Sequence, residues 1–310
     1  MNLFLNCFFT FFLFSSGCLA DQLMIEPDAG RAPLIQAISH ATSSIDLVMY
    51  GLTDEAFIHA LTDAKNQGKK VTLLLQPVPY KSEHENDRAI RDFVREKIQL
   101  CWPDKSIRLT HQKTFILDDK TAIVMTFNLT HASFRNERNV ALVLTDPAEV
   151  HEIRAVFDAD CAHQHVTVTQ PDLLWSPDNS REKLLSLIRS ARMDLKIYAE
   201  SITDHQIIGA LASAARRGVS VTILLPEASE KWHDRKLLFL TKSGVLIRHP
   251  RDLYIHAKVM LIDREKAVIG SINLTKASLD DNRELSVITR DSAVLTQLNE
   301  LFENDWRKSV

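Results

Sequence analysis

Histidine, lysine, aspartate and asparagine recur at one fixed spacing in two distant parts of this sequence. In each copy a lysine follows the histidine by two residues, an aspartate follows it by seven, and a hydroxyl residue and an asparagine close the pattern. The first copy contains His111, Lys113, Asp118, Thr126 and Asn128, and the second contains His256, Lys258, Asp263, Ser271 and Asn273. Equal spacing in two places indicates an internal duplication.

These side chains suit the cleavage of a phosphodiester. Alternate residues of a strand share one face, so the histidine and lysine of each copy are expected to point the same way. One imidazole can attack phosphorus and form a phosphohistidine, while the other protonates the leaving alkoxide. Imidazole titrates near neutral pH, so one ring can be neutral while the other is charged. Lysines, amides and hydroxyls can hold the phosphate oxygens without a metal ion.

The duplication extends well beyond the two patterns. At a constant offset of 145 residues Arg138 matches Arg283 and Asp160 matches Asp305, and further upstream Pro27-Asp28 matches Pro177-Asp178. The sequence therefore predicts two similar domains, residues 21–165 and 166–310. The segment from Gln164 to Asn179 is polar and is interpreted as the linker, held in place through Trp175.

Each half reads as alternating helices and strands. The expected strands of the alternation are Ile45–Tyr50, Val71–Leu75, Leu195–Tyr198 and Val221–Leu225, and the glycine-capped helices are Glu55–Lys65 and His205–Arg216. Further strands are expected at Thr114–Leu117, Ala122–Met125, Val140–Val143, Val259–Ile262, Ala267–Ile269 and Leu285–Ile288. The alternation is typical of α/β proteins. We expect two halves with mixed, largely parallel sheets flanked by helices.

The doubled His-x-Lys-x4-Asp string, with its trailing Gly-Ser-x-Asn turn, resembles the signature of the phospholipase D superfamily. The resemblance covers both halves, although Met125-Thr126 stands in the first half where the second has Gly270-Ser271. It implies two similar α/β halves related by a pseudo-twofold axis, with the active site between them. It also implies a phosphohistidine intermediate and no metal or other cofactor.

The resemblance assigns a role to each matching residue. His111 and His256 become the nucleophile and the acid/base, with His111 favoured as the nucleophile by family precedent. Four residues are expected to bind the phosphate, helped by the hydroxyls of Thr126 and Ser271: Lys113, Lys258, Asn128 and Asn273. Asp118 and Asp263 belong to the catalytic string, but strand alternation places them off the His-Lys face. For these two aspartates a structural or orienting role is favoured over proton transfer.

Family members also place an acid 28 residues after the histidine, where it holds the imidazole Nδ1–H. Glu284 stands at that position after His256 and is expected to make His256 the more basic ring. The equivalent position after His111 holds Asn139, and Glu137 lies two residues away. The choice of nucleophile therefore stays open on the residues alone.

The first twenty residues differ from the rest of the chain. They contain no charged side chain, and an apolar run is followed by small residues up to Ala20. This pattern predicts a signal peptide over residues 1–20 and a secreted or periplasmic protein. A lipoprotein on Cys18 and an uncleaved anchor are less favoured. Beyond this segment Cys101 and Cys161 either pair in an oxidising compartment or remain free thiols.

Three functions fit these observations. The first is a secreted phospholipase D that hydrolyses glycerophospholipids to phosphatidate and a head-group alcohol, with peripheral membrane contact. The second is an endonuclease, favoured by Arg216-Arg217 and by the basic residues around Arg248 but opposed by a net charge of −3. The third is a catalytically inactive binding protein. Transfer of the cardiolipin-synthase kind is less expected than hydrolysis. One chain supplies both motifs, so no partner chain is required.

Overall fold

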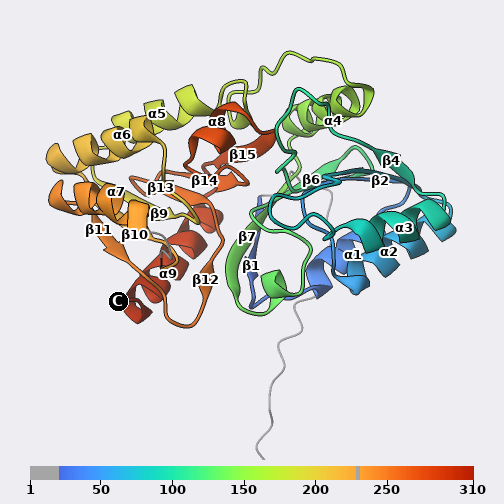
Figure 1. Ribbon diagram of the computed structural model, residues 1–310, viewed down its shortest axis with the longest axis horizontal. Helices are drawn as coiled ribbons and strands as arrows, with labels where there is room; N and C mark the ends of the chain where they lie inside the picture. The colour runs from blue at the N-terminus through green and yellow to red at the C-terminus, as the bar shows by residue number, and fades with distance from the viewer. Residues whose placement is uncertain (1–20, 228–230) are drawn as a thin grey trace, which may run out of the picture.

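The computed structural model describes residues 21–227 and 231–310 and folds them into two α/β halves (Figure 1). The predicted signal peptide lies outside the described residues. The first half contains β1 (Gln22–Glu26), α1 (Ala32–His40), β2 (Ser44–Met49), α2 (Glu55–Asn66), β3 (Lys70–Leu75), α3 (Asp87–Arg95), β4 (Gln99–Cys101), β5 (Thr114–Leu117), β6 (Thr121–Met125), a 3-10 turn (Ala132–Phe134), β7 (Glu137–Leu144) and α4 (Pro147–Ala162). The second contains β8 (Leu173–Ser176), α5 (Ser180–Ser190), β9 (Asp194–Tyr198), α6 (His205–Arg216), β10 (Ser220–Leu224), α7 (Lys231–Lys242), β11 (Leu246–Arg248), β12 (Tyr254–Ile255), β13 (Val259–Ile262), β14 (Lys266–Gly270), α8 (Lys276–Asp280), β15 (Glu284–Thr289) and α9 (Ser292–Lys308).

The two sheets share one strand order. The first runs β1-β7-β6-β5-β2-β3-β4, and the second runs β8-β15-β14-β13-β9-β10-β11 in the same sense. The expectation of largely parallel sheets is wrong. Within these two strand orders, neighbours are parallel in β2-β3-β4 and in β9-β10-β11, where a helix connects them, and β12 adds a parallel contact with β7. The remaining neighbours are antiparallel, and among them β5-β6-β7 and β13-β14-β15 follow one another directly along the chain.

Local sequence signals explain the elements that the repeat predicts. The side chain of Asp54 accepts the N–H of Ala56 at the start of α2, and Asp204 accepts the N–H groups of Gln206 and Ile207 at the start of α6. Both helices are followed by a glycine with positive φ, Gly68 at 90° and Gly218 at 93°. The predicted bounds of β5, β13 and α6 match the structure.

The segment predicted as a linker contains a strand. β8 lies within it and forms the edge of the second sheet beside β15. Trp175 on this strand is fully buried, as expected for a segment that is held in place, and its indole N–H donates to Glu152 at 3.0 Å. The equivalent edge strand β1, beside β7, also escaped prediction, because both strands are short and precede the part of the sequence where the repeat is clear.

The halves share an apolar core, and a disulfide closes the first half. One buried cluster contains residues from both, including Val124 and Leu142 of the first sheet and Ile269 and Leu285 of the second. A disulfide joins Cys101 at the end of β4 to Cys161 near the end of α4, so the cysteine pairing left open by the sequence is present in the structure.

Two arginines, one buried and one partly buried, connect the halves in a symmetric way. Arg138 on β7 donates to Asp305 on α9 of the second half, with Nε–Oδ2 at 2.8 Å. Its sequence equivalent, Arg283, forms an ion pair at 3.0 Å with Asp160 on α4 of the first half. Each arginine also pairs with the aspartate that follows the proline of its own half, Asp28 or Asp178. Residues matched by the repeat therefore form matched contacts across the interface.

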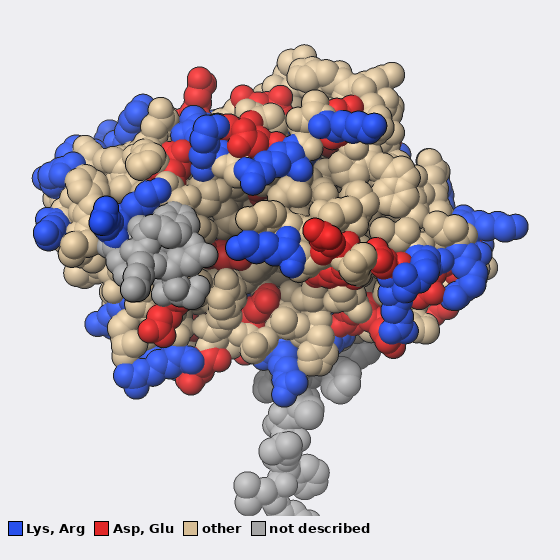
Figure 2. Space-filling model, viewed as in Figure 1, with Lys and Arg blue, Asp and Glu red and all other residues tan. Residues whose placement is uncertain are grey.

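The surface carries charges of both signs. On the face shown in Figure 2, acidic and basic side chains are interspersed over both halves and form no continuous basic stripe. Within residues 21–227 and 231–310, none of the helices has the length and apolar character needed to cross a bilayer.

The interface arginine yields a stability prediction. Arg138→Ala leaves the carboxylate of Asp305 buried without its cation, so we expect the free energy of unfolding to fall by about 3 kcal/mol. Arg264→Ala is the matched control, since Arg264 forms an ion pair with Asp194 while its side chain is 69% exposed. That change should stay within about 1 kcal/mol. Urea denaturation measures both, and equal stabilities for the two variants would contradict the role given to Arg138.

Candidate active site

The backbone of each catalytic histidine is held by the opposite half. The N–H of His111 donates to the carbonyl of Arg283 at 2.9 Å, and the N–H of His256 donates to the carbonyl of Arg138 at 3.2 Å. The two residues before His256 form β12, a strand of the second half that pairs with β7 of the first sheet. The two histidine segments are thereby exchanged between the halves, and the site forms where the sheets meet.

The ring of His111 is held by a carboxylate of the second half. Its Nδ1 lies 2.9 Å from Oε2 of Glu284, which is fully buried on β15 next to Arg283. The expectation that Glu284 holds His256 is therefore wrong. The exchange of histidine segments places β15 beside His111 instead. Ser278 and Asn282 donate to the other oxygen of Glu284 and fix the carboxylate.

The ring of His256 is held by an amide of the first half. Its Nδ1 lies 3.0 Å from Oδ1 of Asn139, the residue equivalent to Glu284. The amide nitrogen of Asn139 donates to Glu137 at 3.0 Å, and the hydroxyl of Thr126 donates to Asn139 Oδ1 at 2.9 Å. Glu137 makes no hydrogen bond to His256. Its Oε2 lies 3.8 Å from Nδ1 of that ring, and it also holds Asn139.

These partners give the two imidazoles different chemistry. Burial and the neighbouring lysines lower the pKa of both rings, and the pKa of His256 falls furthest below its usual value. Glu284 opposes this shift at His111. When Nδ1–H of His111 donates to the carboxylate, Nε2 keeps a lone pair of increased basicity, which suits a nucleophile. His256, held by a neutral amide, more readily returns its proton and suits the acid/base role.

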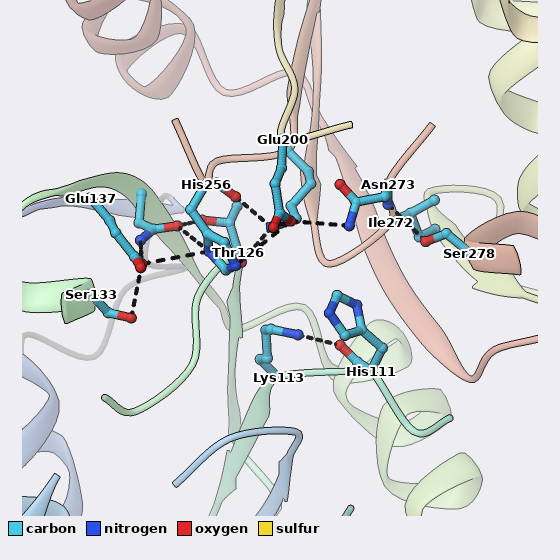
Figure 3. A network of polar contacts seen from close by, with 12 residues as sticks. His111, Lys113, Thr126, Ser133, Glu137, Glu200, His256, Ile272, Asn273 and Ser278 are labelled. Carbon is cyan, nitrogen blue, oxygen red and sulfur yellow. Dashed lines mark hydrogen bonds and ion pairs between the residues drawn. The ribbon is translucent and has the colours of Figure 1, made fainter. Parts of the chain in front are cut away.

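Each lysine lies beside the histidine of its own copy and donates to that histidine's carbonyl, and Figure 3 shows Lys113 next to His111. Lys113 donates to the carbonyl of His111 at 2.6 Å and lies 5.1 Å from the ring centre of Tyr50. Burial and the positive charge of Lys258 lower the pKa of Lys113 to about 7. Lys258 lies 2.7 Å from a carboxylate oxygen of Glu200. The site thus offers two cations for a phosphate, one of them close to losing its proton.

The asparagines reach the site, but the hydroxyls are used elsewhere. The amide nitrogen of Asn273 donates to Glu200 at 3.2 Å, and Asn128 lies against Gly51. The hydroxyl of Ser271 accepts the N–H of Leu285, and that of Thr126 accepts the N–H of Val140. Both hydroxyls therefore tie neighbouring strands together, and this geometry does not favour their predicted role as phosphate ligands.

The first-half departure from Gly-Ser also has a physical reason. A Cβ on Gly270 would stand 2.3 Å from the carbonyl oxygen of Leu285, so only glycine fits beside β15. At the equivalent position Met125 is fully buried in the apolar core of the first half. The methionine fills space there and leaves the catalytic string in register.

Asp118 and Asp263 lie outside the site. Each follows β5 or β13 at the end remote from the histidine. Asp118 accepts the N–H groups of residues 42, 43 and 44, and Asp263 accepts those of residues 192, 193 and 194. These bonds outweigh partial burial and lower the pKa of both carboxyls. This position fits the structural role that was favoured for the two aspartates. It does not fit their inclusion among the catalytic residues.

Sequence reasoning missed Glu200 and Tyr50. They occupy equivalent positions just after β9 and β2, as the matching strand registers show. The Tyr50 ring stands edge-on to His111 with centroids 4.7 Å apart. The repeat aligns Tyr50 with Glu200. Because the two residue types differ, the alignment gave no reason to select this position.

Comparison with known proteins identifies the family. Residues 34–161 and 184–306 match the family model described as cardiolipin synthase, phospholipase D-like domain. The chain belongs to this family. Members of the phospholipase D superfamily are phosphodiester-acting enzymes.

Among curated proteins, this phospholipase D-like chain is similar to mitochondrial cardiolipin hydrolase of Mus musculus, with 27% identity over 132 residues covering 42% of this chain and 60% of the relative. It is also similar to cardiolipin synthase 2 of Staphylococcus epidermidis, with 24% identity over 325 residues covering 89% of this chain and 66% of the relative. The chain thus spans less than two thirds of the length of either protein.

Solved structures support the fold of both halves together. Polyphosphate kinase from Porphyromonas gingivalis superposes with a TM-score of 0.74 at 19% identity, over 93% of this chain and 47% of that one. Phosphatidylserine synthase from Haemophilus influenzae gives 0.68 at 13% identity, over 94% of this chain and 87% of that one. At these identities the likeness concerns the fold alone.

Replacing Glu284 tests the nucleophile assignment. Glu284→Gln removes the charge that stabilises protonated His111, so the pKa of His111 falls and the limb of the kcat/KM profile that titrates with His111 moves to lower pH. The less basic ring should also lower the plateau rate by roughly a hundredfold. Both follow from rates measured between about pH 5 and 9.

Asp118→Asn is the control for this experiment. The pKa of Asp118 is depressed in the folded state, so its carboxylate contributes stability at neutral pH that is lost as the pH falls through the folded-state pKa. This variant should be less stable at neutral pH yet keep the wild-type pH profile of kcat/KM. An unshifted limb in Glu284→Gln would remove the reason for choosing His111.

Proposed function

We propose that this chain is a metal-independent phosphodiesterase that cleaves phospholipids through a phosphohistidine on His111. The proposal depends on one observation: the Nδ1 atoms of the two imidazoles have different hydrogen-bond partners, a carboxylate for His111 and an amide for His256. Two lysines and two asparagines surround them. Among the described residues, no group of three or more His, Cys, Asp or Glu is arranged to hold a metal ion. Independence from metals remains part of the proposal.

In the first step, Nε2 of His111 attacks phosphorus and the bond to the leaving alcohol breaks. Lys113 and Lys258 neutralise the phosphate oxygens. His256, protonated as the anionic phosphate binds, gives its Nε2 proton to the leaving oxygen and becomes neutral. The phosphoryl group is then bonded to His111, and Glu284 stabilises the positive charge that this ring acquires.

In the second step, water attacks the phosphohistidine. Neutral His256 takes a proton from the water as the new P–O bond forms and the P–N bond breaks. The products are a phosphomonoester and regenerated enzyme, with His256 protonated for the next cycle. An alcohol in place of water would give transfer by the same path.

A phospholipid substrate is supported by the relatives and by the surface near the site. The two relatives described above are a cardiolipin hydrolase and a cardiolipin synthase. The N–H of Tyr80 donates to the hydroxyl of Tyr50, which lies beside Lys113, and Tyr80 is 63% exposed. An exposed aromatic residue at this place suits peripheral contact with a lipid surface.

The endonuclease alternative receives less support. The basic residues that favoured it are already engaged: Arg248 stacks on Trp306 and donates to its carbonyl, and Arg216 lies over Phe239. Charges of both signs alternate on the face of Figure 2. An inactive binding protein is also less favoured, because the first-half departures Met125 and Asn139 have structural partners that complete the site.

We further propose that the protein works in an oxidising compartment, as a secreted or periplasmic enzyme. The disulfide between Cys101 and Cys161 supports this location. Cleavage after Ala20 is expected in export-competent cells, and mass spectrometry of the mature N-terminal peptide measures it. Folded protein that keeps residues 1–20 and carries both cysteines as free thiols would contradict the assignment.

Turnover with trapped intermediates tests the proposed chemistry. The purified protein in EDTA is incubated with vesicles of cardiolipin or phosphatidylglycerol and, separately, with plasmid and single-stranded DNA. We expect release of a phosphomonoester lipid, and acid-labile phosphate on His111 after rapid quenching. His111→Ala should lose the phosphoenzyme and at least about a thousandfold in rate.

His256→Ala, the matched variant from the second copy, should slow both steps but leave the phosphate on His111. Label on His256 would reverse the assignment of the two rings. Nicking of DNA without lipid turnover would select the endonuclease. Neither activity, with no labelled histidine, would indicate a binding protein.

A further inference from the structure

A carboxylate stands among the groups that should bind the phosphate. Oε2 of Glu200 lies 2.7 Å from Nζ of Lys258, 3.2 Å from the amide nitrogen of Asn273 and 3.7 Å from Nε2 of His256. Figure 3 shows Glu200 between His256 and Asn273, across from His111 and Lys113. The side chain is only 25% exposed. An ammonium, an amide N–H and an imidazole nitrogen are the donors that a phosphate oxygen would require.

We propose that Glu200 is a specificity residue that makes this site select phosphodiesters over phosphomonoesters, an inference that rests on the phosphate subsite of the proposed function. Its carboxylate holds the phosphate donors of the second half in the empty enzyme. A substrate phosphate takes over Lys258 and Asn273, and the displaced carboxylate stays close enough to repel it.

The repulsion depends on the charge of the ligand. A phosphodiester carries one negative charge, whereas a phosphomonoester carries about two at neutral pH, because its second pKa is about 6. Two charges within a few ångström interact by several kcal/mol at the effective dielectric of a protein surface. A fixed carboxylate therefore weakens binding of the dianion more than that of the monoanion. Hydrolysis turns a monoanion into a dianion, so the same residue favours product release.

The first half shows that this carboxylate is not required by the fold. At the position equivalent to Glu200 stands Tyr50, whose ring contacts Lys113 and His111. The aromatic ring stabilises the lysine without competing for it. At this position the side of the site that holds His256 carries a carboxylate, whereas the side of the nucleophile carries an aromatic ring.

Two ligands that differ by one methyl group test the proposal without turnover. Methyl phosphate is a dianion and dimethyl phosphate a monoanion at about pH 7.5. Their dissociation constants are measured by calorimetry on the full chain and on Glu200→Gln, which keeps the size and the hydrogen-bond acceptor. We expect the ratio of the dimethyl to the methyl phosphate constant to rise at least about tenfold in the variant.

Glu265→Gln is the matched control. Glu265 lies exposed in the turn between β13 and β14, and its substitution removes the same net charge. It should leave the ratio at the wild-type value, and melting curves verify that both variants fold. An unchanged ratio in Glu200→Gln, weaker binding of methyl phosphate, an equal effect of Glu265→Gln, or no phosphate binding by any form would overturn the inference. Because only binding is measured, failure to cleave lipid would count against the proposed function and leave this result standing.

Discussion

The carbonyl groups of Arg138 and Arg283 are the points on which the site depends. Each accepts the backbone N–H of the other half's catalytic histidine, while its own guanidinium is anchored to an aspartate on a helix of that other half. The residue next to each arginine, Asn139 or Glu284, then holds the imidazole through Nδ1. In each half, two adjacent residues therefore hold the backbone and the ring of the other half's histidine and also form the contact between the halves. A shift between the halves would disturb all three, because buried ion pairs tolerate little misalignment.

A duplicated chain begins with two equal halves, whereas the chemistry needs two unequal histidines. The differences between the halves fall where they create that inequality. Glu284 faces Asn139 across the pseudo-twofold axis, and Glu200 faces Tyr50. The carboxylate at Glu284 makes His111 the better nucleophile, and the amide at Asn139 leaves His256 free to exchange its proton. Substitution of single residues on a conserved backbone is sufficient to separate the two roles.

The sequence predicted the repeated parts of the fold well, because hydrophobic periodicity and capping residues act locally. The bounds of β5, β13 and α6 followed from such signals. The repeat also paired Arg138 with Arg283 and Asp160 with Asp305. It did not reveal that each arginine contacts the other half's aspartate, since alignment of two halves gives equivalence and not contact. The same limit explains why Glu284 was assigned to His256. Sheet parallelism was misjudged because the short turns around β5, β6 and β7 were not weighed against the βαβ units.

The site also has to keep two buried lysines charged. Burial and the charge of Lys258 lower the pKa of Lys113 to about 7, and the charges of Glu284, Glu200 and Glu85 oppose that shift. The carboxylates therefore act as counterions before a substrate arrives. A phosphodiester that enters the site takes Lys258 over from Glu200, and the displaced carboxylate stays nearby, where it opposes any further negative charge on the ligand. The arrangement suits a site that binds a monoanion, converts it to a dianion and must then release it.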